Sequence, residues 1–248
     1  LTPAEESAVI DAIIASVQES ISTDLRTLGN NGDFDVSGIN GQFDIEIRNS
    51  RDHADPFGLP NVSRVVVGGT IAELGLSTIG IAETIDVGNF DTSESAVVLL
   101  DLLSAPGSDP NSLNQYPRDP SASIIDLIGV GVGNITAHEA GHFFANWHTY
   151  QFNALPSIMD QGGNLANTIG LVGGVWGDGD ENDVDFGPDT FATNEGFSGT
   201  ENTLQSIAFG LSTGKLDPAL VGPTVLSIDP PAGEVNDLNV ADISIVFN

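Results

Sequence analysis

The chain has 248 residues, and its 6 Lys+Arg against 35 Asp+Glu give a formal net charge of −29. Hydrophobic residues make up 40% of the chain, enough for the core of one good-sized domain and too many for a disordered acidic polypeptide. The acidity argues against nucleic acid as a partner because phosphates need a basic face, and the absence of Cys excludes disulfides, thiolate metal sites and a cysteine nucleophile.

The N-terminal stretch is predicted to be helical. Thr2, Pro3 and Glu5 are of the types favoured at the N-cap, at the first helical position and at the third position of a capping box. Apolar residues then recur at helical spacing as far as Leu28, and Gly29 ends the pattern. One helix is therefore expected over this whole stretch.

Strand patterns follow the first helix. Residues 43–48 alternate apolar with charged side chains, which predicts a half-buried strand. Residues 65–67 are all Val and predict a more deeply buried strand, while the apolar residues of 79–87 share one parity and predict another strand or a hairpin arm. The apolar run 96–103 has no clear period and fits either a strand or a helix, and the prolines of 105–121 predict a loop.

A second long helix is predicted over residues 124–142, where apolar side chains return at helical spacing. Three glycines weaken its first half because Gly is a poor helix former, so the best-supported part is 133–145. Irregular, Gly-rich chain is expected next, followed by a last helix over 204–211.

The end of the chain differs in character from the rest. Prolines punctuate short alternating segments over residues 217–248, which are too few for an independent sheet. This segment resembles the opening of a bacterial Ig-like domain. The resemblance implies one domain over 1–216, a linker and partial Ig-like β segment over 217–248, and a larger multidomain chain. A C-terminal tail that lies on the first domain is the alternative.

Three of the four histidines of the chain lie in one short stretch, His138-Glu139-Ala140-Gly141-His142 followed by His148. On a helix, His138 and His142 project from one face, so both imidazoles can bind one metal ion. Glu139 lies about 100° round the helix, where it can reach a water at the metal without being a ligand. A third imidazole at His148 requires a sharp turn after the helix.

This donor set is typical of a catalytic metal site. Three neutral imidazoles leave one position of a tetrahedral zinc site open, as catalytic zinc requires. Zn²⁺ lowers the pKa of a bound water towards about 7 and polarises a substrate carbonyl. Glu139 is then the expected general base, which takes the proton of the attacking water and passes it to the leaving amine.

The pattern resembles the H-E-x-x-H-x-x-G-x-x-H signature of the metzincin zinc metallopeptidases, which is followed by a methionine turn. The only methionine of the chain, Met159, follows His148 at a short spacing similar to that of the matrixins. The run His148-Thr149-Tyr150-Gln151 is similar to the pappalysins. By this resemblance Met159 forms an apolar floor under the metal, and His138, His142 and His148 are the zinc ligands.

The resemblance also implies a fold and a function. The fold class is α+β, a metzincin-like zincin fold with a twisted mixed sheet and the N-terminal and active-site helices above the cleft. A small irregular C-terminal subdomain with a closing helix lies below the cleft. An edge strand, expected within residues 76–88, binds the protein or peptide substrate in extended form. The implied activity is that of a secreted zinc-dependent endopeptidase, and the alternative is a non-catalytic module of a large cell-surface or adhesive protein.

One position departs from the family pattern. The glycine that takes a left-handed conformation, so that the third histidine can return, corresponds to Ala145. Ala is strained in that conformation by about 1 kcal/mol or more, whereas Asn146 is of the non-glycine type that tolerates it best. We therefore expect the left-handed position to shift to Asn146. The departure also favours the non-catalytic alternative.

An acidic stretch is a candidate calcium site, because its oxygen ligands stand at alternate positions as they do in calcium loops. The EF-hand glycine and final Glu are absent, so a solvated acidic loop is the alternative. The candidate ligands are Asp178, Asp180, Asn182, Asp183 and Asp185.

Three weaker candidates remain. Tyr150 or Tyr116 could stabilise the oxyanion of a tetrahedral intermediate, as tyrosine does in some metzincins, or could simply pack beside the cleft. Asp52, His53 and Asp55 could hold a second structural ion, although a lone histidine between carboxylates is more often a hydrogen-bonded surface residue.

Composition also bears on location. The excess of carboxylates suits a solvated surface in a salty or calcium-rich medium, which favours a secreted or extracellular protein, or one at the cell surface. No apolar run approaches the about 20 residues of a membrane-spanning helix, so membrane insertion is not expected.

Overall fold

The computed structural model describes residues 3–27, 29–30, 33–34, 41–43, 45–216, 225–229 and 244–247, and the side chains of 5–25 and 45–211. The helices are α1 (Pro3–Val17), the π-helical η1 (Gln18–Thr23), α2 (Asp24–Thr27), α3 (Ile71–Leu74), α4 (Leu100–Leu103), the 3-10 turn η2 (Leu113–Gln115), α5 (Ile124–His142), α6 (Leu165–Thr168) and α7 (Thr203–Gly210). The strands are β1 (Gly29–Asn30), β2 (Asp33–Phe34), β3 (Gly41–Phe43), β4 (Arg64–Val67), β5 (Gly80–Ala82), β6 (Ser95–Val98), β7 (Pro188–Thr190), β8 (Thr200–Asn202), β9 (Ser212–Leu216), β10 (Val225–Asp229) and β11 (Ser244–Phe247).

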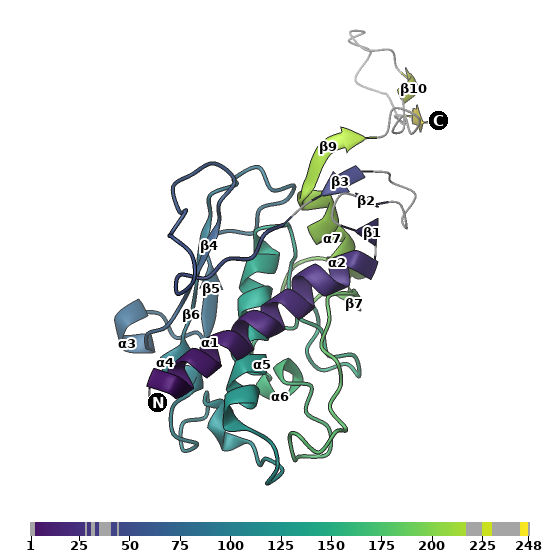
Figure 1. The fold of residues 1–248 in the computed structure, drawn as a ribbon. Helices are drawn as coiled ribbons and strands as arrows, with labels where there is room; N and C mark the ends of the chain where they lie inside the picture. The colour runs from purple at the N-terminus through teal and green to yellow at the C-terminus, as the bar shows by residue number, and fades with distance from the viewer. Residues whose placement is uncertain are drawn as a thin grey trace.

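The two long helices form the centre of the molecule. Helix α1 continues through η1 into α2 and lies across α5 (Figure 1). Both helices bury apolar residues at helical spacing, among them Val9, Ile13 and Val17 of α1 and Leu127 and Val132 of α5. The core therefore sits between these helices and the elements on either side of α5.

Two glycines allow the close approach of α1 to α5. A Cβ at Gly129 would overlap the side chain of Ala12, and a Cβ at Gly133 would overlap that of Ser16. The hydroxyl of Ser16 also donates a hydrogen bond of 2.8 Å to Oδ1 of Asn134. The glycines that weaken α5 as an isolated helix thus form its contact surface for α1.

A small mixed sheet of order β4-β6-β5 packs on α5. β4 is parallel to β6, with Val67 opposite Val98, and β5 is antiparallel to β6, with Gly80 also opposite Val98. Figure 1 shows this sheet and α7 on opposite sides of α5. β5 is an edge strand of this sheet within residues 76–88, where the sequence places the substrate-binding edge.

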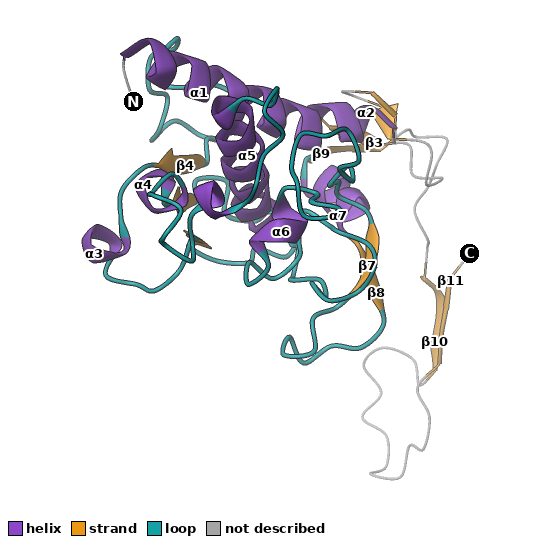
Figure 2. Ribbon diagram, turned by 90° about the horizontal axis from the view of Figure 1, so that it is seen from below, coloured by secondary structure: helices purple, strands orange, loops and turns teal. Residues whose placement is uncertain are grey.

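The rest of the described chain is mostly irregular, as Figure 2 shows around α6. β7 and β8 form an antiparallel hairpin ahead of α7, and β1, β2, β3 and β9 form a four-stranded antiparallel sheet. The last helix is followed directly by β9. The architecture is mixed α+β with small sheets, which agrees with the α+β class expected from the sequence.

Several local expectations are wrong in detail. Of the strand expected over 43–48, Phe43 ends β3 and residues 45–49 form no strand. The alternation of partly buried and exposed side chains is present in 45–49, but within the described part of the chain no strand pairs with this segment. β4 is less buried than expected because it is an edge strand, and Val66 remains 45% exposed. The ambiguous run 96–103 contains both a strand and a helix, β6 and α4.

Most of the segment that resembles an Ig-like domain lies outside the described residues. Within 217–248 the structure describes only β10 and β11, which pair with each other antiparallel. The proposed division at residue 216 therefore stays a prediction. Across the described helices, none combines the length and the apolar character needed to cross a membrane.

Candidate metal centre

The last turns of α5 present His138, Glu139 and His142. Both histidines and Glu139 are buried, with exposed fractions of 8% or less. The four-residue spacing puts the two imidazoles on one helix face, and their ring centroids are 4.8 Å apart. Helix α5 thus supplies two donors and a carboxylate from a rigid element.

A left-handed turn ends α5, and it is formed at Ala145. Ala145 has φ of +84°, so the expected shift to Asn146 is wrong. The reason is the hydrogen bonding of the helix end: the N–H of Asn146 donates to the carbonyl of Gly141 at 3.2 Å, and the N–H of Ala145 donates to that of His142 at 3.3 Å. These two bonds define a Schellman motif whose left-handed residue is Ala145.

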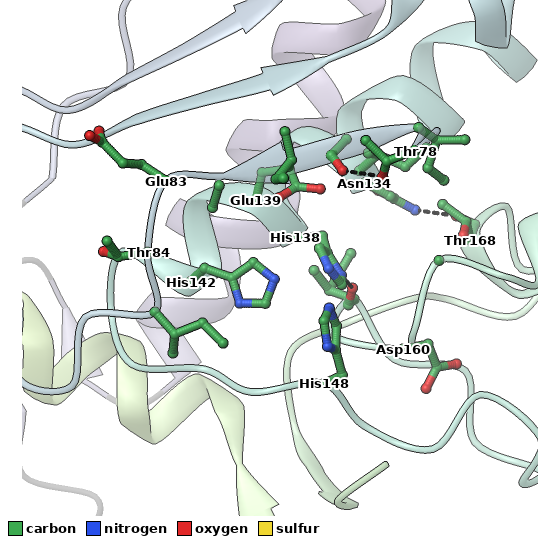
Figure 3. Close-up of a pocket in the computed structure, with 18 residues that line it drawn as sticks. Thr78, Glu83, Thr84, Asn134, His138, Glu139, His142, His148, Asp160 and Thr168 are labelled. Carbon is green, nitrogen blue, oxygen red and sulfur yellow. Dashed lines mark hydrogen bonds between the residues drawn. The ribbon is translucent and has the colours of Figure 1, made fainter. Parts of the chain in front are cut away.

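The turn sends the chain back so that His148 faces the helix. Its ring centroid lies 5.3 Å from that of His138 and 4.9 Å from that of His142. One nitrogen of each ring lies within 4.8 Å of those of the other two, so this group could hold a metal ion. Figure 3 shows the three imidazoles facing one another.

Hydrogen bonds fix which nitrogen of each ring is available. Nδ1 of His138 lies 2.7 Å from the carbonyl oxygen of Ile158, and Nδ1 of His142 lies 2.8 Å from that of Asn146. A carbonyl oxygen can only accept, so each Nδ1 carries the proton and each Nε2 keeps a lone pair. Nδ1 of His148 lies 2.5 Å from Oε1 of Glu195, which leaves its Nε2 free as well. The donor set fits a divalent cation bound by three neutral imidazoles.

The electrostatics favour these protonation states. Burial, and next the neighbouring histidines, lower the pKa of His138 well below its usual value, and burial lowers the pKa of His142 to about 4. Burial raises the pKa of Glu139 to about 8, although a hydrogen bond from the backbone of Ala82 acts in the opposite direction. Both helix histidines are therefore neutral at physiological pH.

Met159, the residue expected to form the methionine turn, is fully buried and lies against α5 beside Gly141. The carbonyl of Met159 accepts the N–H of Thr149 at 2.7 Å, which ties the methionine segment to the residue after His148. A Cβ at Gly141 would come within 2.7 Å of the Met159 sulfur, so the glycine inside the histidine motif gives the methionine its space. The carboxylate of Asp160 accepts from the hydroxyl of Thr149 at 3.1 Å and supports the same turn.

A cavity of about 440 Å³ opens in front of the three histidines. Its walls are β5 with its neighbours, residues 78–85, the α5 face that carries the motif, and the segment that follows Met159 (Figure 3). β5 passes close over Glu139, and a Cβ at Gly80 would overlap the Glu139 carboxylate. Within the described residues the cavity lining contains carboxylates but no Lys or Arg.

The candidate calcium residues do not form one site. Asp183 and Asp185 converge with Glu19 of η1, and ligand oxygens of these three residues lie within 4.8 Å of one another. Asp178 and Asp180 lie exposed on a turn in which the Asp180 N–H donates to Oδ1 of Asp178 at 3.2 Å.

Asn182 is exposed, and its N–H donates to the carbonyl of Gly170 at 2.8 Å. Among the described residues, only Asp183 and Asp185 of the five candidates converge on a possible cation position, and the calcium site stays a prediction. Exposed acidic groups are common without an ion, so no calcium site is assigned.

The weaker candidates lie away from the cavity. Neither Tyr150 nor Tyr116 lines it: Tyr150 makes an aromatic contact with Phe152, and Tyr116 packs against the hydrophobic core. His53 is exposed, with Nδ1 3.2 Å from the carbonyl of Asn49. Nη2 of Arg51 lies 2.7 Å from Oδ2 of Asp52, and this hydrogen bond lowers the pKa of the Asp52 carboxyl to about 2. The neighbours of His53 thus form a surface ion pair.

One site residue is missed by sequence reasoning. Glu195 touches the third histidine although it lies far along the chain in an irregular segment, where no spacing rule applies. The pairing of 190–192 with 148–150 brings its segment to His148.

Comparison with protein-family models, with curated proteins and with solved structures finds no match for this chain.

Proposed function

We propose that this chain is a zinc-dependent endopeptidase of the metzincin type. The observation that carries the proposal is the arrangement of three imidazoles, each with Nδ1 engaged, beside the buried carboxylate of Glu139. A cleft bounded by an edge strand adjoins this group. The buried Met159 beside Gly141 of the histidine motif, the helix α1 across α5 and the irregular chain before α7 are also consistent with that family.

The donor chemistry supports zinc. Neutral imidazoles suit a borderline-soft divalent cation, and three of them leave a position open for catalysis. When bound, Zn²⁺ supplies a Lewis acid that acidifies water and polarises a carbonyl. The high acidic charge of the chain is consistent with a secreted enzyme, which we include in the proposal.

The protein residues then have separate roles. The backbone of β5 binds a peptide in extended form, because along one edge of this strand no neighbouring strand uses its N–H and C=O groups. Glu139 lies beside the histidines, where its ionised form takes a proton from the attacking water and returns it to the leaving nitrogen. Burial disfavours that ionised form, and the charge of a bound zinc ion would favour it. The backbone of Ala82 holds the Glu139 carboxylate by a hydrogen bond, so the strand that binds the peptide also orients the base.

The test is Glu139→Gln in the purified chain. The parent should contain about one zinc per chain and cleave an unfolded protein, and a chelator should abolish cleavage until zinc is restored. Glu139→Gln keeps the shape and the metal but lacks the base, so cleavage should fall by about 10²- to 10⁴-fold. Metal content is measured by elemental analysis and cleavage by release of a fluorescent label.

Glu181→Gln is the matched control, because Glu181 lies outside the cavity lining and accepts the N–H of Gly179 at 3.2 Å in a surface loop. It should cleave like the parent. Equal rates for Glu139→Gln and the parent would contradict the assigned mechanism, and a parent with no bound metal would contradict the function.

The alternative, a non-catalytic module of a larger cell-surface or adhesive protein, draws support from Ala145 in place of the family glycine and from the Ig-like segment after residue 216. The first support is weakened, because Ala145 takes the left-handed conformation that the motif requires. The retained base, Glu139, has no evident use in a module that only binds a partner.

A further inference from the structure

The third histidine is held differently from the other two. The Nδ1 atoms of His138 and His142 meet main-chain carbonyls, which no substitution can remove. The Nδ1 atom of His148 instead meets the side chain of Glu195, at 2.5 Å from Oε1. One ligand of the three thus depends on a side chain for its orientation.

The segment that carries Glu195 is fastened to the chain around His148. The N–H of Tyr150 donates to the carbonyl of Thr190, and the N–H of Ala192 donates to that of His148, both at 2.9 Å. A turn closed by a 3.1 Å bond from the Glu195 N–H to the carbonyl of Ala192 then brings the carboxylate back to the ring. The contact between His148 and Glu195 is therefore built by the backbone.

The position of His148 explains why such a support matters. His138 and His142 are buried on a helix, whereas His148 lies on the returning loop with 31% of its side chain exposed. The Glu195 side chain is only 11% exposed, so water competes little for the contact. A carboxylate also accepts more strongly than a carbonyl, which makes the opposite ring nitrogen a better electron donor.

We propose that Glu195 is a positioning residue that orients His148 through Nδ1 and so determines how tightly the three histidines bind a divalent metal ion. The inference rests on the metal site of the proposed function, but it concerns metal affinity and not peptide cleavage. Partners of this kind typically contribute a factor of about 10 to 100 in metal affinity.

The experiment measures Co²⁺ and Zn²⁺ affinity by competition with a chromophoric chelator, and the visible absorption of the Co²⁺ protein. Glu195→Ala should bind both ions about 10- to 100-fold more weakly than the parent, with an altered Co²⁺ spectrum. Glu195→Gln keeps an acceptor for Nδ1 of His148 but lacks the charge, so its metal affinity should lie between those of the parent and Glu195→Ala. Glu201→Gln is the control, because it removes a nearby charge whose carboxylate accepts the main-chain N–H of Trp147 and not the ring. Its affinity should stay within about threefold of the parent.

Thermal melting in chelator shows whether each variant is folded, since a loss of affinity counts only in a variant that melts like the parent. If Glu195→Ala does not fold, the metal affinity of Glu195→Gln is compared with that of Glu201→Gln. A weaker affinity of Glu195→Gln supports the inference, and an equal affinity overturns it. Equal affinity of the Glu195 variants and the parent would overturn this inference and leave the proposed function standing. A parent that binds neither ion would overturn both.

Discussion

Ala145 holds a conformation that favours glycine, and the reason lies in its neighbours. At the end of α5 the N–H groups of Asn146 and Ala145 donate to the carbonyls of Gly141 and His142, and this pair of bonds goes with a left-handed conformation at residue 145. The carbonyl of Asn146 is also used, because it accepts Nδ1–H of His142. The strain at Ala145 is thus offset by hydrogen bonds at the end of α5, one of which orients the imidazole of His142.

This strain predicts that Ala145→Gly stabilises the protein. Glycine removes a penalty of about 1 kcal/mol at φ of +84°, and its larger freedom in the unfolded chain cancels part of the gain. A net gain of about 0.5 kcal/mol corresponds to an increase of about 1–2 °C in Tm for a chain of this size. Thermal melting in the presence of a chelator measures it without a contribution from bound metal.

Ala140→Gly provides the comparison, because the same substitution inside helix α5 should lower stability by about 1 kcal/mol or more. A decrease in Tm for both variants would mean that residue 145 is not strained.

At the level of single residues, local geometry predicts the part of the candidate site that one helix carries, and the resemblance to a known motif adds His148. The spacing of His138, Glu139 and His142 follows from helical geometry alone. The choice between Ala145 and Asn146 depends on the hydrogen-bond pattern at the end of α5, and intrinsic preference gives the wrong answer. Glu195 depends on pairing between distant segments, for which local sequence has no signal.

At the level of elements, α1 and α5 were predictable because apolar periodicity is local. The way in which these two helices contact each other was not predictable. From sequence alone, Gly129 and Gly133 argue against a helix, and only the structure shows that the side chains of Ala12 and Ser16 occupy the space beside them. Residues 45–49 show the converse. Their alternation correctly indicates which side chains face inward, but a strand also needs a partner, and sequence alone cannot supply one.

The junction between the N-terminal helices and the acidic loop predicts a pH dependence of stability. Asp24 of α2 is 8% exposed, and burial together with the charges of Asp185 and Glu19 raises its pKa to about 8. A backbone hydrogen bond from Phe186 acts in the opposite direction. In the unfolded chain the pKa is about 3.9, so folding takes up a proton between these two values. The stabilisation is complete below about pH 4 and is lost as the pH rises through about 8.

Asp24→Asn should therefore be more stable than the parent at pH 9, by about 2 kcal/mol, and should show a flatter dependence of Tm on pH from 5 to 9. The amide oxygen can still accept the backbone bond. Asp180→Asn is the control, because Asp180 is exposed on the acidic loop that also carries Asp185. The pH dependence of its Tm should follow that of the parent. A parallel Tm profile for Asp24→Asn and the parent would show that Asp24 is ionised in the folded protein.

At the scale of the whole molecule, the net charge of −29 is little compensated. Among the described side chains, the Arg–carboxylate pairs are those of Arg48 with Glu46 and of Arg51 with Asp11 and Asp52. Arg64 lies instead over the ring of Phe57, 3.8 Å from its centroid, so its cation is not used for an ion pair. The folded state therefore concentrates repulsion between carboxylates that the unfolded chain can spread apart.

Salt should stabilise the protein through screening of this repulsion. Raising NaCl from about 20 mM to about 500 mM shortens the Debye length from about 20 Å to about 4 Å, which removes most interactions between distant surface charges. We expect Tm to increase by about 5 °C, with the same increase for KCl because screening does not depend on which monovalent cation is present. A Tm that falls with salt would mean that the few ion pairs outweigh the repulsion. A rise with only one of the two salts would indicate specific cation binding instead, so melting curves in both salts separate a property of the whole surface from one of a single site.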